Sequence, residues 1–200
     1  MTSTPESAAH PISPVWNLPN VLTMLRIALV PVFVVLLWQD TPGMRLGALA
    51  VFIVAAITDK LDGSIARARG IVTNFGKIAD PFADKLLTGS AFVVLSFLGD
   101  IPWWVTIVIL VREIGITVLR FVMVRRSVMA ASNGGKLKTV LQVVAICLLI
   151  FPAQALLGDP FGTIVVVSGL IVLYAAAAVT VVTGLDYCWR AWRIAADQRT

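Results

Sequence analysis

The stretch from Asp59 to Asp84 reads DKLDGSIARARGIVTNFGKIADPFAD and carries four aspartates. Asp59 and Asp62 are three residues apart, so they lie on one face if this part of the chain is helical. Asp80 and Asp84 are four residues apart, which again places two carboxylates on one helical face. Long apolar runs flank the stretch on both sides. Charges beside a bilayer are costly and usually mark a functional site, so the stretch predicts one.

The composition predicts an integral membrane protein. Of the 200 residues, 58% are hydrophobic and only 14% are charged, and the mean hydropathy is +0.91. These values lie far outside the range of soluble domains. The formal net charge is +5, which in a membrane protein reports orientation and contact with anionic lipid. No interleaving of basic and aromatic residues is seen, so we expect no nucleic-acid partner.

Six apolar runs predict an all-α membrane fold with six transmembrane helices. Each run is long enough to cross a hydrocarbon core, which takes about 20 helical residues. Residues 1–14 are rich in Ser, Thr, Pro and Ala, and we predict that they are disordered. Residues 15–200 are predicted to form one membrane domain, which begins with a short interfacial segment at 16–20. The predicted spans are 21–38, 44–61, 82–98, 102–124, 138–156 and 162–184.

Lysine and arginine are distributed unequally between the connections of these spans. The connections on the side of the Asp59–Asp84 stretch carry most of the basic residues. The opposite connections carry aspartates, with only Arg45 at an edge. The positive-inside rule therefore predicts that both termini and the acidic stretch lie on the cytoplasmic side of the cell membrane.

The acidic stretch has the donor types that a divalent-metal site requires. Two helix ends, each offering two carboxylates to one gap, can hold Mg²⁺ or Mn²⁺ and share the ions with phosphates. Two such ions would stabilise the attacking and leaving oxygens of a phosphoryl displacement. One carboxylate could instead deprotonate an attacking hydroxyl. The alternative is a solvated loop whose acids pair with Lys60, Lys77 and Lys85.

The pattern D-x-x-D-G-x-x-A-R-x8-G-x-x-x-D-x-x-x-D resembles the signature of the CDP-alcohol phosphatidyltransferases at every motif position. The resemblance implies a six-helix membrane fold and an enzyme that displaces CMP from a CDP-linked lipid with an alcohol. It also implies two divalent cations and, commonly, a homodimer. By position, two sets of residues receive roles. Those implied to hold the metals are Asp59, Asp62, Asp80 and Asp84, with Asp84 also the general base. Those implied to lie along the cytidine diphosphate are Gly63, Ala66, Arg67 and Gly76.

Four shorter stretches resemble one branch of this family, the phosphatidylglycerophosphate synthases. These stretches are 17–26, 112–120, 135–142 and 186–193. The branch implies CDP-diacylglycerol and sn-glycerol 3-phosphate as substrates, and phosphatidylglycerophosphate and CMP as products. Two alternatives keep the same chemistry, namely a cardiolipin synthase that accepts phosphatidylglycerol and a transferase that accepts an inositol phosphate. A more remote alternative is a cation channel or transporter without enzymatic activity.

A phosphorylated acceptor agrees with the basic residues of the fourth and fifth predicted spans. Arg112 and Glu113 fall midway along an apolar run, so they should face the bundle interior. Arg120 lies nearer the cytoplasm, and Lys136 and Lys138 enter the fifth span on the same side. Together these cations predict a pocket for the acceptor phosphate. The alternatives are a structural ion pair for Arg112 with Glu113 and a membrane-edge anchor for the two lysines.

The first predicted span begins with a further group of polar residues. Asn20, Thr23 and Arg26 are candidates for contacting the CDP-lipid or for orienting the aspartates. The alternative is that Asn20 caps the helix and that Arg26 extends to the headgroups.

Overall fold

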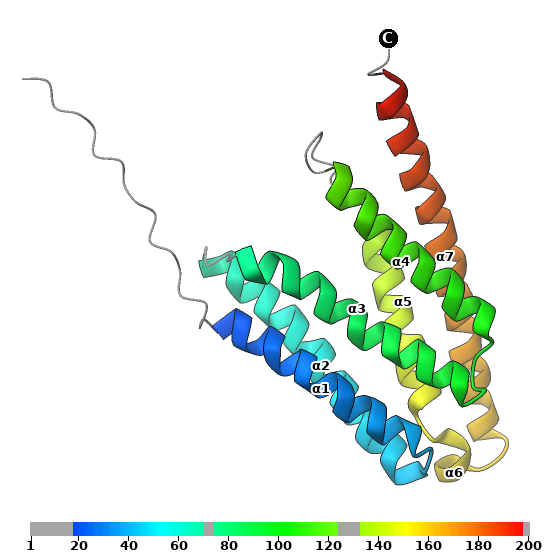
Figure 1. Ribbon diagram of the computed structural model, residues 1–200. Helices are drawn as coiled ribbons and strands as arrows, with labels where there is room; N and C mark the ends of the chain where they lie inside the picture. The colour runs from blue at the N-terminus through cyan, green and yellow to red at the C-terminus, as the bar shows by residue number, and fades with distance from the viewer. Residues whose placement is uncertain (1–17, 70–73, 124–132, 198–200) are drawn as a thin grey trace, which may run out of the picture.

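The computed structural model describes residues 18–69, 74–123 and 133–197, and in these ranges all regular structure is helical (Figure 1). Some side chains within the helices, including 59–81, 83–84, 119–123, 133–136 and 190–197, lie outside the described part. The helices are α1 (Leu18–Trp38), α2 (Pro42–Arg69), α3 (Asn74–Phe97), α4 (Trp103–Met123), α5 (Asn133–Ile150), α6 (Ala153–Leu157) and α7 (Phe161–Asp197).

The long helices run up and down in two groups (Figure 1). In the first group α1 packs against α2 and α3, and in the second α7 packs against α4, α5 and the short α6. Contacts of α2 with α5, and of α3 with α4 and α5, join the groups. The groups lie close together near α6 and diverge toward the opposite end (Figure 1). That diverging end holds the last turns of α2 and α4 and the first turns of α3 and α5.

The core is formed by apolar side chains from the six long helices α1, α2, α3, α4, α5 and α7. Phe33 of α1 and Phe52 of α2 are fully buried, with ring centroids 5.7 Å apart. Leu95 of α3, Ile109 of α4 and Ile146 of α5 are also buried. Transfer of each large apolar side chain from water into such a core stabilises the fold by about 1.5–3 kcal/mol. The core therefore fixes how the polar ends of α2, α3 and α5 are placed relative to one another.

Two described helices are long and apolar enough to cross a membrane, judged by length and composition. They are Val21–Trp38 within α1 and Phe161–Trp189 within α7. Shorter apolar segments occupy Pro42–Thr58, Lys85–Phe97 and Leu137–Ile150. The all-helical expectation is confirmed for the described residues, whereas the six spans and their orientation stay predictions.

The predicted continuous span 138–156 is wrong at its second half. Helix α5 ends at Ile150, and α6 begins separately at Ala153. Pro152 lies between them, and a proline has no N–H with which to continue the hydrogen-bond ladder of a helix. At the N-terminus, Leu18–Asn20 belong to the first turn of α1 and not to a separate interfacial segment.

The end of the bundle near α6 is held by the guanidinium of Arg45. Its Nε donates to Asp40 Oδ1 at 2.6 Å, and its Nη2 donates to Asp100 Oδ2 at 2.5 Å. Its Nη1 donates to the Leu149 carbonyl at 3.1 Å. Arg45 thus ties together the α1–α2 turn, the α3–α4 turn and the end of α5. Burial raises the pKa of Asp100, and the positive charge of Arg45 offsets part of that rise.

Replacing Arg45 with methionine is expected to lower the free energy of unfolding by about 1–3 kcal/mol at neutral pH, because Asp100 is left charged and unpaired. The folded protein holds the Asp100 proton more tightly than the unfolded chain does, so this carboxyl favours folding most at low pH. The loss should therefore shrink as the pH falls toward the ordinary carboxyl pKa. Thermal unfolding of the detergent-solubilised protein at neutral and acidic pH measures the difference.

The control is Thr163→Val, which loses an exposed hydrogen bond to Asp159 at the same end of the bundle. It should cause a loss smaller than that of Arg45→Met at neutral pH, because the hydrogen bond that it removes is exposed. A loss for Arg45→Met that is equal at neutral and acidic pH would contradict the ion-pair explanation.

Candidate active site

The acidic stretch occupies two packed helices at the diverging end of the bundle. Asp59 and Asp62 lie in the C-terminal half of α2, and Asp80 and Asp84 lie in the N-terminal half of α3. The two helices contact each other. This confirms the predicted helical setting of both aspartate pairs. The side chains at these positions lie outside the described residues, so metal binding and the general-base role stay predictions. The same holds for Gly63, Ala66, Arg67, Gly76 and Asn20.

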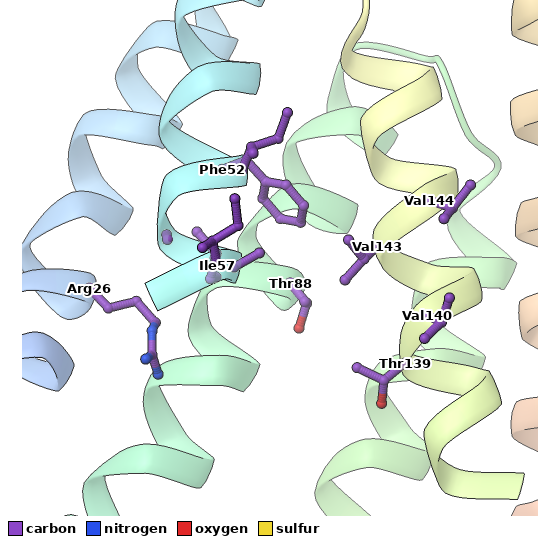
Figure 2. Close-up of a pocket in the computed structure, with 12 residues that line it drawn as sticks. Arg26, Phe52, Ile57, Thr88, Thr139, Val140, Val143 and Val144 are labelled. Atoms are coloured by element: carbon purple, nitrogen blue, oxygen red, sulfur yellow. The ribbon is translucent and has the colours of Figure 1, made fainter. Parts of the chain in front are cut away.

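A cavity of about 260 Å³ lies between α1, α2, α3 and α5 (Figure 2). Most of its lining is apolar, including Phe52 and Ile57 of α2 and Val143 and Val144 of α5. It lies directly beside the acidic segments, because Ile57 precedes Asp59 by two residues. An apolar space at this position is suited to the lipid part of a substrate.

The polar side chains of this cavity gather at one end. Arg26, Thr88 and Thr139 lie toward the end that contains Ile57, whereas Phe52 lies toward the other end (Figure 2). Thr88 is one helical turn beyond the last aspartate of the stretch. The cavity is therefore polar where it approaches the acidic segments and apolar farther away.

Arg26 lies buried in the cavity wall, which the sequence did not predict. Its side chain is 1% exposed and lines the cavity wall from α1. The interpretation that Arg26 extends to the lipid headgroups is therefore wrong, because an extended arginine would remain exposed. Thr23, one turn earlier on α1, is fully buried. A role for either residue at the CDP-lipid remains a prediction.

A second polar group lies inside the bundle between α4, α5 and α7. Arg112 Nη1 is 3.3 Å from Glu113 Oε1, and the same oxygen accepts a short hydrogen bond from Lys138 Nζ. Arg112 Nη2 donates to Thr183 Oγ1 at 2.9 Å. The ionic side chains are 8–17% exposed, so these contacts are largely screened from solvent. We call Arg112, Glu113, Lys138 and Thr183 the interior charged cluster.

The backbone of α7 passes close to Arg112 in this cluster. A methyl group added at Gly184 would lie 3.1 Å from Arg112 Cγ, so a larger residue there would displace the arginine. Arg112 Nε has no hydrogen-bond partner among the described residues, and neither has Nε2 of buried Gln142. A buried donor without a partner is costly, so these two donors favour an acceptor bound from outside the chain.

The structure shows the contacts of the residues predicted for the acceptor pocket, and their substrate role stays a prediction. Arg112 and Glu113 face the bundle interior, as predicted, and they form the ion pair that was the alternative to substrate binding. Lys138 is 6% exposed, so the anchor interpretation is wrong for this residue. The side chains of Arg120 and Lys136 lie outside the described residues.

Sequence reasoning did not identify three side chains of this region as site residues. Lys85 of α3 is close enough to Lys138 for the two positive charges to interact. Thr183 accepts a hydrogen bond from Arg112, and Gln142, one turn after Lys138 on α5, is buried. The signal for Lys85 was present, since it follows Asp84 directly, whereas Thr183 stands in a long apolar run without any local sign of a polar partner.

Among the described side chains of this region, cations outnumber anions. Arg112, Lys138 and Lys85 are positive, and Glu113 is the negative side chain among them. Among the described side chains of this region, positive charge is therefore in excess, and electrostatic interactions inside an apolar bundle are stronger than in water. Such a cluster can bind an anion with charge-assisted hydrogen bonds.

The fold and the site define a helical protein with apolar helices, a mostly apolar cavity of about 260 Å³, a charged cluster inside the bundle and four aspartates on two helices in contact. The family model described as CDP-alcohol phosphatidyltransferase matches residues 16–182. The chain therefore belongs to the CDP-alcohol phosphatidyltransferase family, as its signature predicted. The match covers every residue of that signature.

Relatives of known description cover most of the chain. A Mycobacterium tuberculosis protein named "Probable phosphatidylglycerophosphate synthase" is 49% identical over 180 residues, which are 88% of this chain and 82% of that protein. A Bacillus subtilis protein named CDP-diacylglycerol–glycerol-3-phosphate 3-phosphatidyltransferase is 37% identical over 88% of this chain and 96% of its own length. A rice protein named cardiolipin synthase (CMP-forming) is 34% identical over 89% of this chain and 58% of its own length.

Proposed function

We propose that the protein transfers the phosphatidyl group of CDP-diacylglycerol to sn-glycerol 3-phosphate, which gives phosphatidylglycerophosphate and CMP. The observation that carries the choice of acceptor is the interior charged cluster, in which Lys138 is buried, the Arg112 side chain is 12% exposed and the two cations face one carboxylate. A phosphomonoester dianion is the kind of group that such a cluster attracts. The names and the high coverage of the mycobacterial and Bacillus relatives support the same choice.

In the proposed mechanism the chain's own residues position the acceptor and move its proton. Arg112 and Lys138 hold the phosphate of glycerol 3-phosphate, with Arg120 and Lys136 contributing positive charge nearby. Asp84 accepts the proton of the attacking glycerol hydroxyl. The hydroxyl oxygen then forms a bond to the phosphorus that bears diacylglycerol, and the bond from that phosphorus to CMP breaks.

The aspartates of α2 and α3 fit a divalent-metal site by the chemistry of their donors. Carboxylates from two helices in contact would supply the oxygen ligands that Mg²⁺ and Mn²⁺ prefer. Two such cations would neutralise charge on the reacting phosphates. Around them, the CDP-lipid would lie along α2 and the start of α3, with α1 beside it. The residues proposed for the metals are Asp59, Asp62, Asp80 and Asp84, and those proposed for the CDP-lipid are Gly63, Ala66, Arg67, Gly76, Asn20 and Thr23.

The proposed setting is the cell membrane, crossed six times, with both termini and the active site on the cytoplasmic side. The apolar helices Val21–Trp38 and Phe161–Trp189 support membrane insertion. The distribution of lysine and arginine supports the orientation. Glycerol 3-phosphate is soluble, so it can reach the diverging end of the bundle from the cytoplasm, while CDP-diacylglycerol arrives from the bilayer. A homodimer is proposed on the family resemblance alone.

The cavity beside the acidic segments is proposed to hold the lipid part of CDP-diacylglycerol. Its polar end contains Arg26, Thr88 and Thr139, and its apolar end extends along Phe52 and Val144 (Figure 2). A CDP-lipid has the same order of polar and apolar parts. The cavity and the interior charged cluster would therefore receive different substrates from neighbouring sides of α5, which carries both Val143 and Lys138.

Replacing Val143 with tryptophan is expected to raise the KM for CDP-diacylglycerol about tenfold, because an enlarged side chain in a fitted apolar space costs about 1–3 kcal/mol. The KM for glycerol 3-phosphate should stay within about twofold of the unmodified protein's value, since a change at one of two independent sites leaves binding at the other unaffected. Steady-state CMP release in mixed micelles, with each substrate varied in turn, measures both constants. The matched control is Val182→Trp, at a valine of α7 that is 66% exposed. An equal rise for both variants would show that the cavity does not receive the lipid.

The acceptor assay tests the proposed function itself. Purified full-length protein with CDP-diacylglycerol and Mg²⁺ or Mn²⁺ is offered glycerol 3-phosphate, phosphatidylglycerol or inositol phosphate, and CMP release is followed. We expect release with glycerol 3-phosphate at a kcat/KM at least about 100-fold above the other two, as expected when buried polar groups need a matching partner. Preference for phosphatidylglycerol would favour the cardiolipin synthase alternative, the activity named for the rice relative. If CMP were released equally fast in the absence of any acceptor, the choice of glycerol 3-phosphate would be overturned.

A further inference from the structure

We propose that Glu113 is a positioning residue, which holds Lys138 and Arg112 in the arrangement that binds the acceptor phosphate. The inference rests on the proposed function and deepens it, because it concerns a carboxylate that the reaction scheme above leaves without a role. Glu113 is acidic in a site proposed for an anion, which is the opposite of what phosphate binding alone would require. Its contacts explain why it is there.

One oxygen of Glu113 joins the two cations. Oε1 is 3.3 Å from Arg112 Nη1 and also accepts the short hydrogen bond from Lys138 Nζ. Arg112 is fixed from the other side by Thr183 of α7, at 2.9 Å. The contact between Glu113 and Lys138 links α4 to α5, so the carboxylate sets where the ammonium of Lys138 lies relative to the guanidinium of Arg112.

Glu113 does not use all of the N–H groups of the two cations that it positions. An ammonium has three N–H groups and a guanidinium has five. The contacts to Glu113 and Thr183 use the Nη1 and Nη2 nitrogens of Arg112, and Nε has no hydrogen-bond partner among the described side chains. Among the described residues, Lys138 Nζ donates to Glu113 Oε1, which uses one of its three N–H groups. The remaining donors can bind a phosphate while Glu113 stays in place.

Without this carboxylate the cations would repel one another. The positive charges of Arg112 and Lys85 repel the ammonium of Lys138, which lies in a largely buried position. Like charges in such surroundings repel more strongly than in water. A lysine on a flexible four-carbon stem would move away, and the acidic ends of α2 and α3 offer it other partners. A freed Lys138 would then be misplaced for the acceptor.

The experiment compares Glu113→Gln with Glu113→Asp in the purified full-length protein. Rates of CMP release are measured with glycerol 3-phosphate varied at saturating CDP-diacylglycerol, and then with the lipid varied. We expect Glu113→Gln to raise the KM for glycerol 3-phosphate about 10- to 100-fold, the loss that follows when charge-assisted hydrogen bonds are displaced. The kcat and the KM for CDP-diacylglycerol should change less than about threefold, since neither substrate's reacting atoms touch Glu113. Glu113→Asp retains the charge and should recover a large part of the loss.

Asp100→Asn is the matched control, because it also removes a carboxylate from an ion pair within the bundle, at the end near α6. It should lower thermal stability while leaving both KM values unchanged. A lower KM for glycerol 3-phosphate in Glu113→Gln would overturn the proposal, since it would show that Glu113 competes with the phosphate. A fall in kcat alone, or a Glu113→Asp variant as impaired as Glu113→Gln, would also overturn it.

Binding of inorganic phosphate separates this proposal from the proposed function. The phosphate-dependent rise in melting temperature is measured for the unmodified protein and for Glu113→Gln. We expect the rise to be present in the first and reduced in the second. If the unmodified protein released no CMP with glycerol 3-phosphate, the proposed function would fail, and the phosphate measurement would still decide the role of Glu113. An equal rise in both proteins would exclude positioning by Glu113.

Discussion

Replacing Asp84 with asparagine is expected to lower kcat for CMP release by about 10²–10⁴-fold, the contribution typical of a general base. Asparagine has nearly the shape of aspartate, but it cannot accept the hydroxyl proton of the acceptor. It also offers a weaker ligand to a divalent cation, so the fall should be deepest when metal is limiting. The measurement is steady-state CMP release at saturating CDP-diacylglycerol and glycerol 3-phosphate, repeated over a series of Mg²⁺ or Mn²⁺ concentrations.

The matched control is Asp159→Asn, in the turn before α7 at the opposite end of the bundle. Asp159 Oδ1 accepts a hydrogen bond from Thr163 at 2.6 Å, and the site is exposed. This variant should keep the kcat of the unmodified protein within about twofold, as expected for a surface change. Near-normal turnover by Asp84→Asn at saturating metal would remove Asp84 from the role of base and leave the family signature without its proposed proton acceptor.

Replacing Lys138 with glutamine is expected to raise the KM for glycerol 3-phosphate about 100-fold, because hydrogen bonds to charged groups contribute about 1.5–3 kcal/mol. Two effects act in the same direction. The phosphate loses a buried cation, and Glu113 loses one of its two cationic partners, so its negative charge is less neutralised where the dianion must bind. The KM for CDP-diacylglycerol should change little. The two constants come from the same CMP-release assay with one substrate varied at a time.

Lys138→Arg tests whether charge alone is sufficient. Arginine keeps the positive charge but has a larger, planar head, and the two cations are not interchangeable where donor geometry matters. We expect a KM between those of the unmodified protein and Lys138→Gln. If Lys138→Gln kept the original KM and lost only thermal stability, then the contact with Glu113 would be a structural lock between α4 and α5, and the acceptor phosphate would have to bind elsewhere.

Much of the fold could be predicted because hydrophobic length and periodicity are local properties. The apolar run at 21–38 corresponds to the helix Val21–Trp38, and the run at 162–184 lies within α7. The break after Ile150 was missed, although Pro152 was visible in the sequence. Average hydropathy continues across a proline, whereas the helical hydrogen-bond ladder does not. Helix ends are therefore predicted less well than helix centres.

In the candidate site, too, the placement of some residues could be predicted from the sequence and that of others could not. The prediction that Arg112 and Glu113 face inward needed only the cost of exposing charge to lipid, and it is confirmed. The burial of Arg26 was missed because an arginine near a membrane edge can reach water along its own side chain. Lys138 shows the same difficulty, since its sequence position suits an anchor as well as a buried ion pair. For such long side chains, burial depends on which neighbouring helix covers them.

The sequence by itself determined the family, and it predicts metal binding for the acidic stretch. The spacings of Asp59, Asp62, Asp80 and Asp84 act within single helical turns, so they can be interpreted without knowing how the helices pack. The tertiary structure alone decided which residues from distant parts of the chain meet. Lys138 of α5 contacts Glu113 of α4, and Arg112 contacts Thr183 of α7. The physical reason is that the packing of helix faces is set by the combined burial of the whole apolar core, and no local pattern around these residues specifies it.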